Sequence, residues 1–121
     1  MAKKIKLKKF TDKRGSLTVL DKEIKFKVER TYLIYNAGKE RGGHRHKKNI
    51  QAMIAVQGSC KIFVNDGKNK KYFILSNKND CLILKPNDWH VMNSFSKNCI
   101  LLVLCSEKYH KNDYINEPYD N

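Results

Sequence analysis

The sequence has no apolar stretch long enough to cross a membrane, because its longest apolar run, residues 100–105, falls far short of the ~20 residues that a transmembrane helix needs. The basic N-terminus is followed by neither an apolar segment nor a cleavage site, so we expect no signal peptide and a cytoplasmic protein. The four cysteines form no Cys-x-x-Cys pair, which excludes the common cysteine zinc motifs and predicts buried free thiols.

Acidic residues are scarce: 12 Asp and Glu face 25 Lys and Arg, for a net charge of +13. A positive protein attracts anions, and nucleic acid is the first candidate. However, only four of the 25 basic residues are arginines, and the lysines are scattered along the chain. This distribution predicts a small anionic ligand and argues against a nucleic-acid partner.

Helical periodicity is almost absent, apart from a predicted turn or two near residues 113–115. Short β-branched and aromatic segments dominate instead, with turn signals recurring every 8–12 residues or so, as in an all-β barrel. Residues 65–68 predict a type I′ hairpin turn, while residues 50–56 fit either a buried strand or a short helix. With 121 residues, we expect one all-β domain spanning residues 1–121. The other expected strands cover residues 5–10, 17–20, 26–35, 60–64, 72–75, 81–84, 91–95 and 100–105.

Two of the four histidines, His44 and His46, stand two residues apart after the glycine-rich stretch 38–43. On an extended chain they point to the same side, with Cα atoms roughly 6–7 Å apart. Both imidazoles can therefore reach one ligand.

The spacing around these histidines resembles that of the cupin superfamily. Gly38 stands six positions before the first histidine, and Gly58 stands seven after Gln51, as in the first cupin motif. Residues 86–90 resemble the second motif, with Asp80 in place of its opening glycine. The resemblance implies a small jelly-roll barrel.

Metal-binding cupins place a carboxylate where this chain has Gln51, and His90 could supply a third histidine ligand. A neutral amide binds divalent cations poorly compared with a carboxylate. We therefore expect no metal and no cofactor, and assign Gln51 to substrate binding.

A longer series of motifs is similar to that of the sugar-nucleotide 3,4-ketoisomerases. The resemblance covers about residues 10–115, and it implies isomerisation of dTDP-4-dehydro-6-deoxyglucose to its 3-keto isomer, a step toward a 3-amino-3,6-dideoxyhexose. Arg45 departs from it, since the family more often has a small residue between the two histidines. The matching segments are residues 12–17, 30–32, 41–47 with Gln51, 58–59, 89–90, Tyr109 and 113–115.

Moving a ketone from C4 to C3 needs a base and an acid with a pKa near 7, and histidine supplies both. We therefore predict that His44 and His46 transfer the protons. The resemblance adds Tyr32 as a hydrogen-bond donor to the developing enolate oxygen.

Four further residues are predicted to bind substrate together with Gln51 and His90. Arg30 and Arg41 suit the diphosphate, because a guanidinium matches phosphate geometry. The resemblance places Arg14 and His90 near the sugar, which favours the galacto product over the gluco product. Trp89 either stacks on thymine or closes the mouth of the barrel.

Two other functions fit the same fold. A sugar-nucleotide 3,5-epimerase also removes protons beside a ketone, although such enzymes are usually longer and use a His/Asp dyad. A non-catalytic cupin that binds an anionic ligand is the other alternative. Family analogy predicts a homodimer with exchanged N-terminal strands.

Overall fold

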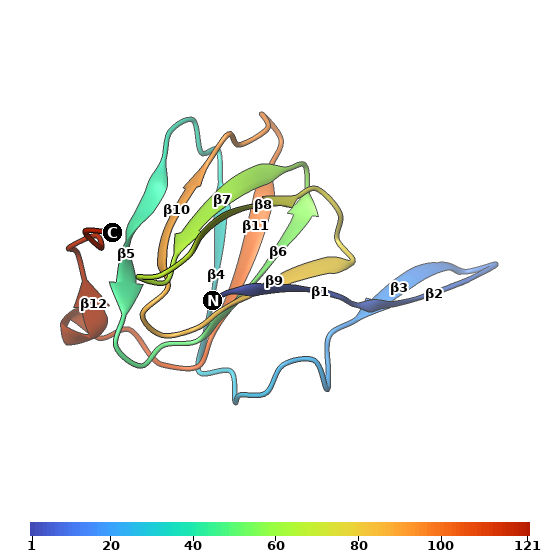
Figure 1. The fold of residues 1–121 in the computed structure, drawn as a ribbon. Coiled ribbons are helices and arrows are strands. Elements are labelled where there is room, and N and C mark those ends of the chain that lie inside the picture. The colour runs from blue at the N-terminus through green and yellow to red at the C-terminus, as the bar shows by residue number, and fades with distance from the viewer.

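The computed structural model describes all 121 residues, which form two five-stranded antiparallel sheets packed face to face and a separate two-stranded hairpin (Figure 1). The strands are β1 (Lys3–Lys6), β2 (Lys8–Asp12), β3 (Gly15–Val19), β4 (Arg30–Tyr35), β5 (Arg41–His46), β6 (Gln51–Gln57), β7 (Cys60–Asn65), β8 (Lys70–Leu75), β9 (Asp80–Leu84), β10 (Trp89–Asn93), β11 (Ile100–Cys105) and β12 (Tyr114–Ile115), with a 3₁₀ turn, η1 (Lys111–Asp113), before the last. The first sheet has the order β1-β9-β6-β11-β4 and the second β12-β5-β10-β7-β8. The predicted all-β jelly roll is confirmed.

The core lies between the two sheets, and the burial of their side chains explains why these segments form strands. Along β7, Cys60, Ile62 and Val64 are buried while the residues between them are partly exposed, so one face packs inward. β6 is buried on both faces, because a second apolar cluster covers its outer side. The short-helix alternative for residues 50–56 is therefore wrong. No helix of the structure has the length and apolar character needed to cross a bilayer.

The segment before β4 differs from the prediction. The expected strand 26–35 begins only at Arg30, and residues 20–29 run without regular structure. Leu20, Ile24 and Phe26 pack instead against the second apolar cluster, on the outer side of β6. Apolar residues there serve as a cover for the sheet, which sequence periodicity alone did not distinguish from a strand.

The glycine-rich stretch 38–43 lies partly within a strand, because Gly42 and Gly43 belong to β5. Gly42 has a φ of +90°, and a Cβ atom there would lie 2.9 Å from the carbonyl oxygen of His90. The missing side chain thus allows β5 to lie close to β10, where His44 pairs with His90. The expected two-residue type I′ turn is wrong as well, since Asn65 pairs with Lys70 across a four-residue loop.

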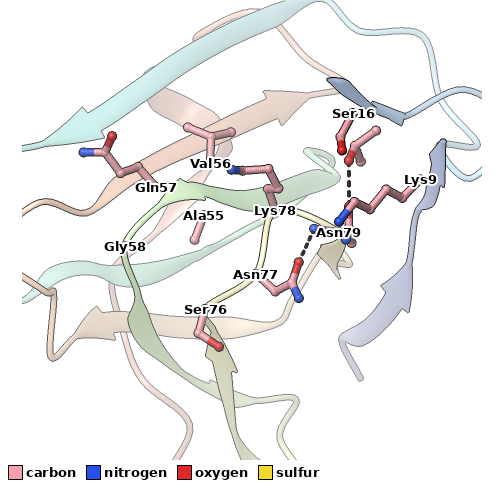
Figure 2. A pocket seen from close by; sticks show the side chains of 11 residues that line it. Lys9, Ser16, Ala55, Val56, Gln57, Gly58, Ser76, Asn77, Lys78 and Asn79 are labelled. Carbon is pink, nitrogen blue, oxygen red and sulfur yellow. Dashed lines mark hydrogen bonds between the residues drawn. The ribbon is translucent and has the colours of Figure 1, made fainter. Parts of the chain in front are cut away.

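The β2–β3 hairpin extends away from the two sheets (Figure 1) and pairs only with itself. Phe10 and Leu17 lie opposite each other on it and are 57% and 62% exposed. Where the hairpin meets the body, Thr18 donates a hydrogen bond to Asn79 (2.6 Å) beside a cleft of about 520 Å³ (Figure 2). This cleft is lined by none of the predicted site residues.

Candidate active site

A pocket of about 400 Å³ opens beside the predicted histidine pair. Its walls come from β4, β5, β10 and the C-terminal segment, so residues distant in sequence meet there. The lining residues are Arg30, Thr31, Tyr32, Ile34, Arg41, Gly42, His44, Met92, Tyr109 and Tyr114.

His44, which lines this pocket, belongs to a cluster of three histidines. His44 and His46 lie on one face of β5 with ring centroids 5.0 Å apart, as their spacing predicts. His90, from the neighbouring strand β10, lies 4.9 Å from His44 and 6.1 Å from His46. His46 and His90 are almost completely buried, and His44 is partly exposed toward the pocket.

Burial keeps these imidazoles neutral near pH 7. Loss of hydration, with the neighbouring His46, lowers the pKa of His44 to about 4. Burial lowers the pKa of His90 to about 3, although its Nδ1–H donates to the carbonyl oxygen of Asp88 (3.1 Å). A neutral imidazole offers one nitrogen as a donor and the other as a proton acceptor.

His46 differs from the other two because it contacts a carboxylate. Its Nδ1 lies 2.9 Å from Oδ2 of Asp113, which comes from the C-terminal segment. Burial lowers the pKa of His46, and the Asp113 carboxylate opposes that effect. Burial would raise the pKa of Asp113, but hydrogen bonds from the Lys48 amide and from His46 outweigh it and leave that pKa below its usual value. Asp113 is therefore ionised at neutral pH.

Tyr32, in the pocket wall, is paired with Gln51 behind it. The Gln51 side-chain amide donates to the Tyr32 hydroxyl oxygen at 3.1 Å. Burial raises the pKa of Tyr32 to about 12, so the phenol keeps its proton. Since its oxygen accepts from Gln51, the Tyr32 O–H remains available as a donor. Gln51 is buried behind Tyr32 and is not among the residues that line the pocket.

Both predicted phosphate-binding arginines line the same pocket. The Arg30 guanidinium lies 5.2 Å from the centroid of the Tyr32 ring and 5.7 Å from that of Tyr109. It also donates to the Tyr114 hydroxyl at 3.4 Å. Arg41 is exposed at the edge of the pocket. The pocket thus places positive charge beside the neutral histidines.

Two other predicted substrate contacts lie outside this pocket. Arg14 sits at the tip of the β2–β3 hairpin, where its side chain is 90% exposed and pairs with Asp12 at 2.6 Å. Because the hairpin extends away from the sheets, Arg14 does not reach the pocket of its own chain. Trp89 precedes the inward-facing His90 on β10, so its side chain faces the opposite side of the strand.

Sequence reasoning gave no role to Tyr109, Asp113 or Tyr114, which the fold brings to the site. The Tyr114 ring lies 4.8 Å from that of His44 and 4.5 Å from that of His46. Strand β12 pairs with β5, with Tyr114 opposite His46, although the two are distant in sequence. Residues 113–115 were part of the family resemblance, but nothing in their local sequence indicated this pairing.

The three histidines are also the residues that could hold a metal ion, since their ligating nitrogens lie within 4.8 Å of one another. Nε2 of His46 and Nε2 of His90 are buried without a hydrogen-bond partner. This donor set contains no carboxylate, because Gln51 takes that position in the motif and contacts Tyr32. Three neutral imidazoles suit a zinc-like ion better than a hard cation such as Mg²⁺.

Comparison with known proteins gives consistent results. The family model described as "FdtA: WxcM-like, C-terminal" matches residues 1–121. The chain is 39% identical over 123 residues to a TDP-4-oxo-6-deoxy-α-D-glucose-3,4-oxoisomerase of Aneurinibacillus thermoaerophilus, covering 98% of this chain and 88% of the relative.

Two solved structures extend the comparison. A 3,4-ketoisomerase from Helicobacter canadensis is 41% identical, with a TM-score of 0.90, over 96% of this chain and 90% of that one. A mutant 3,4-ketoisomerase from Thermoanaerobacterium thermosaccharolyticum, solved in complex with TDP-4-keto-6-deoxyglucose, is 36% identical with a TM-score of 0.90, over 96% and 87% of the two chains.

Proposed function

We propose that this chain, which belongs to the FdtA family and resembles the 3,4-ketoisomerases throughout its length, is an isomerase that moves the ketone of TDP-4-dehydro-6-deoxyglucose from C4 to C3. The observation that carries the proposal is the pocket itself. It is lined by His44, Tyr32 and two arginines, and His46 lies directly behind it with its ring 5.0 Å from that of His44, which suits proton transfer on an anionic substrate.

The substrate and the product are isomers of equal oxidation state, so the reaction needs no oxidant. A base removes the C3 proton, the electron pair of that C–H bond forms the C3=C4 double bond, and the former carbonyl oxygen at C4 gains a proton to give an enediol. The O3–H proton then leaves, its electrons form the C3 ketone, and C4 receives a proton through the electrons of the C3=C4 bond.

His44 and His46 are the proton-transfer pair in this proposal. Both are neutral near pH 7, so each can accept a proton through one ring nitrogen. Their rings are close enough to serve neighbouring carbons of one sugar. General acid–base groups of this kind typically contribute about 10²- to 10⁴-fold to the rate.

Tyr32 is the proposed donor to the enolate oxygen. Its pKa of about 12 keeps the phenol protonated at neutral pH. The hydrogen bond from Gln51 fixes the hydroxyl oxygen while leaving the O–H free. A fixed donor aimed at a developing oxyanion stabilises the transition state more than the ground state. Gln51 therefore supports the substrate through Tyr32 and not by direct contact.

Arg30 and Arg41 are the proposed diphosphate ligands. Both guanidinium groups lie at the same pocket as His44, and a guanidinium pairs with phosphate oxygens through two parallel N–H groups. The diphosphate is not cleaved, so it serves to anchor the sugar over the histidines.

We further propose that the working protein is a homodimer with exchanged N-terminal strands. The projecting hairpin and its exposed Phe10 and Leu17 support this arrangement, since a second copy could bury them. The exchange would carry Arg14 to the partner's sugar site. With Arg14 and His90 near the sugar, we favour the galacto configuration at C4.

The remaining features follow from the same assignment. One domain covers residues 1–121, and no metal or cofactor takes part. The four cysteines are buried and free, which supports a reducing, cytoplasmic location. The 3-ketone is the form that an aminotransferase needs to make a 3-amino sugar.

One observation favours the 3,5-epimerase alternative: His46 and Asp113 form the kind of His/Asp pair that such enzymes use.

Product analysis separates the candidate functions. Incubation with TDP-4-keto-6-deoxyglucose, followed by proton NMR, should show a 3-ketone with a small H4–H5 coupling for the galacto product. A retained 4-ketone with hydrogen exchange at C3 and C5 indicates an epimerase, and binding without turnover indicates a non-catalytic cupin.

A further inference from the structure

The Asp113 carboxylate is held from three directions. Its Oδ1 accepts the backbone N–H of Lys48 at 2.8 Å, and its Oδ2 lies 3.4 Å from the backbone nitrogen of Asn49 and 2.9 Å from Nδ1 of His46. The backbone carbonyl of Asp113 accepts the N–H of Lys47 at 2.9 Å. The C-terminal segment is thereby fixed beside the end of β5, with Oδ2 aimed at one nitrogen of His46.

This contact determines the tautomer of His46. An ionised carboxylate can only accept, so Nδ1 must carry the proton and Nε2 must carry the lone pair. Nε2 of His46 is buried and has no partner within the protein. The unshared pair therefore lies on the nitrogen that is left free at the histidine cluster.

His44 is in a different environment. The Gly42 backbone favours its protonated form, but no carboxylate contacts it, and burial together with His46 lowers its pKa to about 4. For His46 the carboxylate counteracts burial directly. Of the two histidines on β5, His46 alone has a fixed anion to stabilise the imidazolium that forms when it takes a proton.

We infer that Asp113 is a positioning residue for the isomerisation, holding His46 with Nδ1 protonated and with the lone pair on Nε2, within the cluster that also contains the pocket-lining His44. The inference rests on the proposed function and assigns the two histidines unequal roles, with His46 as the stronger base. It also makes the C-terminal segment part of the active site.

The sharpest variant is Asp113→Asn. The backbone N–H groups of Lys48 and Asn49 need an acceptor, so the Asn oxygen should face Lys48 and its NH₂ group should face Nδ1 of His46. That NH₂ group donates, which forces the proton of His46 onto Nε2. We expect kcat to fall about 10²- to 10⁴-fold with KM nearly unchanged, since a wrong histidine tautomer has effects of this size.

A matched control is Asp66→Asn. The Asp66 carboxylate also accepts two backbone N–H groups, from Lys68 at 2.9 Å and Asn69 at 2.7 Å, but it contacts no histidine. We expect this variant to keep its kcat. Equal losses of kcat in the two variants would overturn the inference, because they would show that Asp113 acts only by holding its loop.

Two readouts are specific to positioning. The acid limb of the kcat–pH profile should shift to lower pH in Asp113→Asn, because the base loses its carboxylate. Nitrogen-15 NMR of the histidine ring should show His46 protonated at Nδ1 in the native protein and at Nε2 in the variant. An unmoved acid limb, or the same tautomer in both proteins, would overturn the inference.

The NMR measurement on the native protein needs neither substrate nor a stable variant. If native His46 carries its proton on Nε2, the inference fails even if the protein is an active isomerase. If native His46 carries it on Nδ1 while no 3-ketone forms, the positioning stands and the proposed function fails. The two claims can therefore fail separately.

Discussion

The strands of the histidine pocket and those of the N-terminal hairpin differ in how much they contact the rest of the chain. In the pocket, β4, β5, β10 and the C-terminal segment meet, and contacts within one chain hold His46 through Asp113 and Tyr32 through Gln51. In the hairpin, β2 and β3 pair only with each other, and Phe10 and Leu17 are left exposed. Within one chain, therefore, packed strands surround the histidine pocket, while the hairpin leaves two large apolar side chains exposed.

The largest expected effect tests the pocket side of this comparison. His44→Asn and His46→Asn should each lower kcat about 10²- to 10⁴-fold, because each removes a proton-transfer group, while nucleotide binding stays nearly intact. Steady-state kinetics and calorimetry with TDP measure the two effects.

His110→Asn is the matched control, since His110 is an exposed histidine of the C-terminal segment outside the pocket. It should retain its rate. Full activity in both pocket variants would show that the protons are transferred by other groups.

The next effect tests the hairpin side. Phe10→Glu and Leu17→Glu should weaken the dimer, because each replaces an apolar side chain whose burial is worth about 1.5–3 kcal/mol, or roughly 10- to 100-fold in affinity. Analytical ultracentrifugation gives the dissociation constant of each variant.

Tyr72→Glu is the control for an exposed apolar residue outside the hairpin, since Tyr72 is 61% exposed on β8. It should leave the dimer unchanged. A native protein that sediments as a monomer at micromolar concentration would contradict strand exchange.

A smaller effect concerns stability and pH. His44 and His90 have pKa values of about 4 and about 3 in the folded protein, against ~6.5 when unfolded. The unfolded chain therefore binds more protons as the pH falls from about 6.5 toward 4, so the free energy of unfolding should decrease by up to ~1.4 kcal/mol per pH unit for each histidine.

Urea unfolding at several pH values between 4.5 and 7 measures this slope. His110→Asn, which alters an exposed histidine, should leave it unchanged. A free energy of unfolding that is constant over this range would contradict the neutral state of the buried histidines.

The smallest expected effect is that of metal removal. EDTA treatment should leave kcat unchanged, because the proposed chemistry uses only protein groups. A rate that collapses with EDTA and returns with a divalent ion would assign His44, His46 and His90 to a metal instead.

The same comparison explains what the sequence could predict. The positions of β7 and β11 were predictable, because the first half of β7 alternates between apolar and polar residues and β11 is a short run of apolar residues. The shared orientation of His44 and His46 was predictable from a period of two. The sequence predicted strand structure for residue 20 and residues 26–29, because apolar side chains that cover a sheet resemble those that form one.

Contacts between distant segments were not predictable from local pattern. Asp113 reaches His46 through the pairing of β12 with β5, and Gln51 reaches the Tyr32 hydroxyl from a neighbouring part of the sheet. Gly42 allows the close approach of β5 to β10, which depends on the distant carbonyl oxygen of His90. Trp89 adjoins the inward-facing His90 in sequence, and its side chain lies on the opposite face of β10 because neighbouring residues of a strand face opposite sides.

Isomerisation in deuterated water, with the protein freed of metal by chelation, tests the two-histidine proton transfer most directly. The account predicts a 3-ketone that carries deuterium at C4, with both formation and labelling suppressed in His44→Asn and in His46→Asn. Contradiction would come from a folded protein that forms no 3-ketone without a divalent ion, or from a product that keeps the original C3 hydrogen at C4.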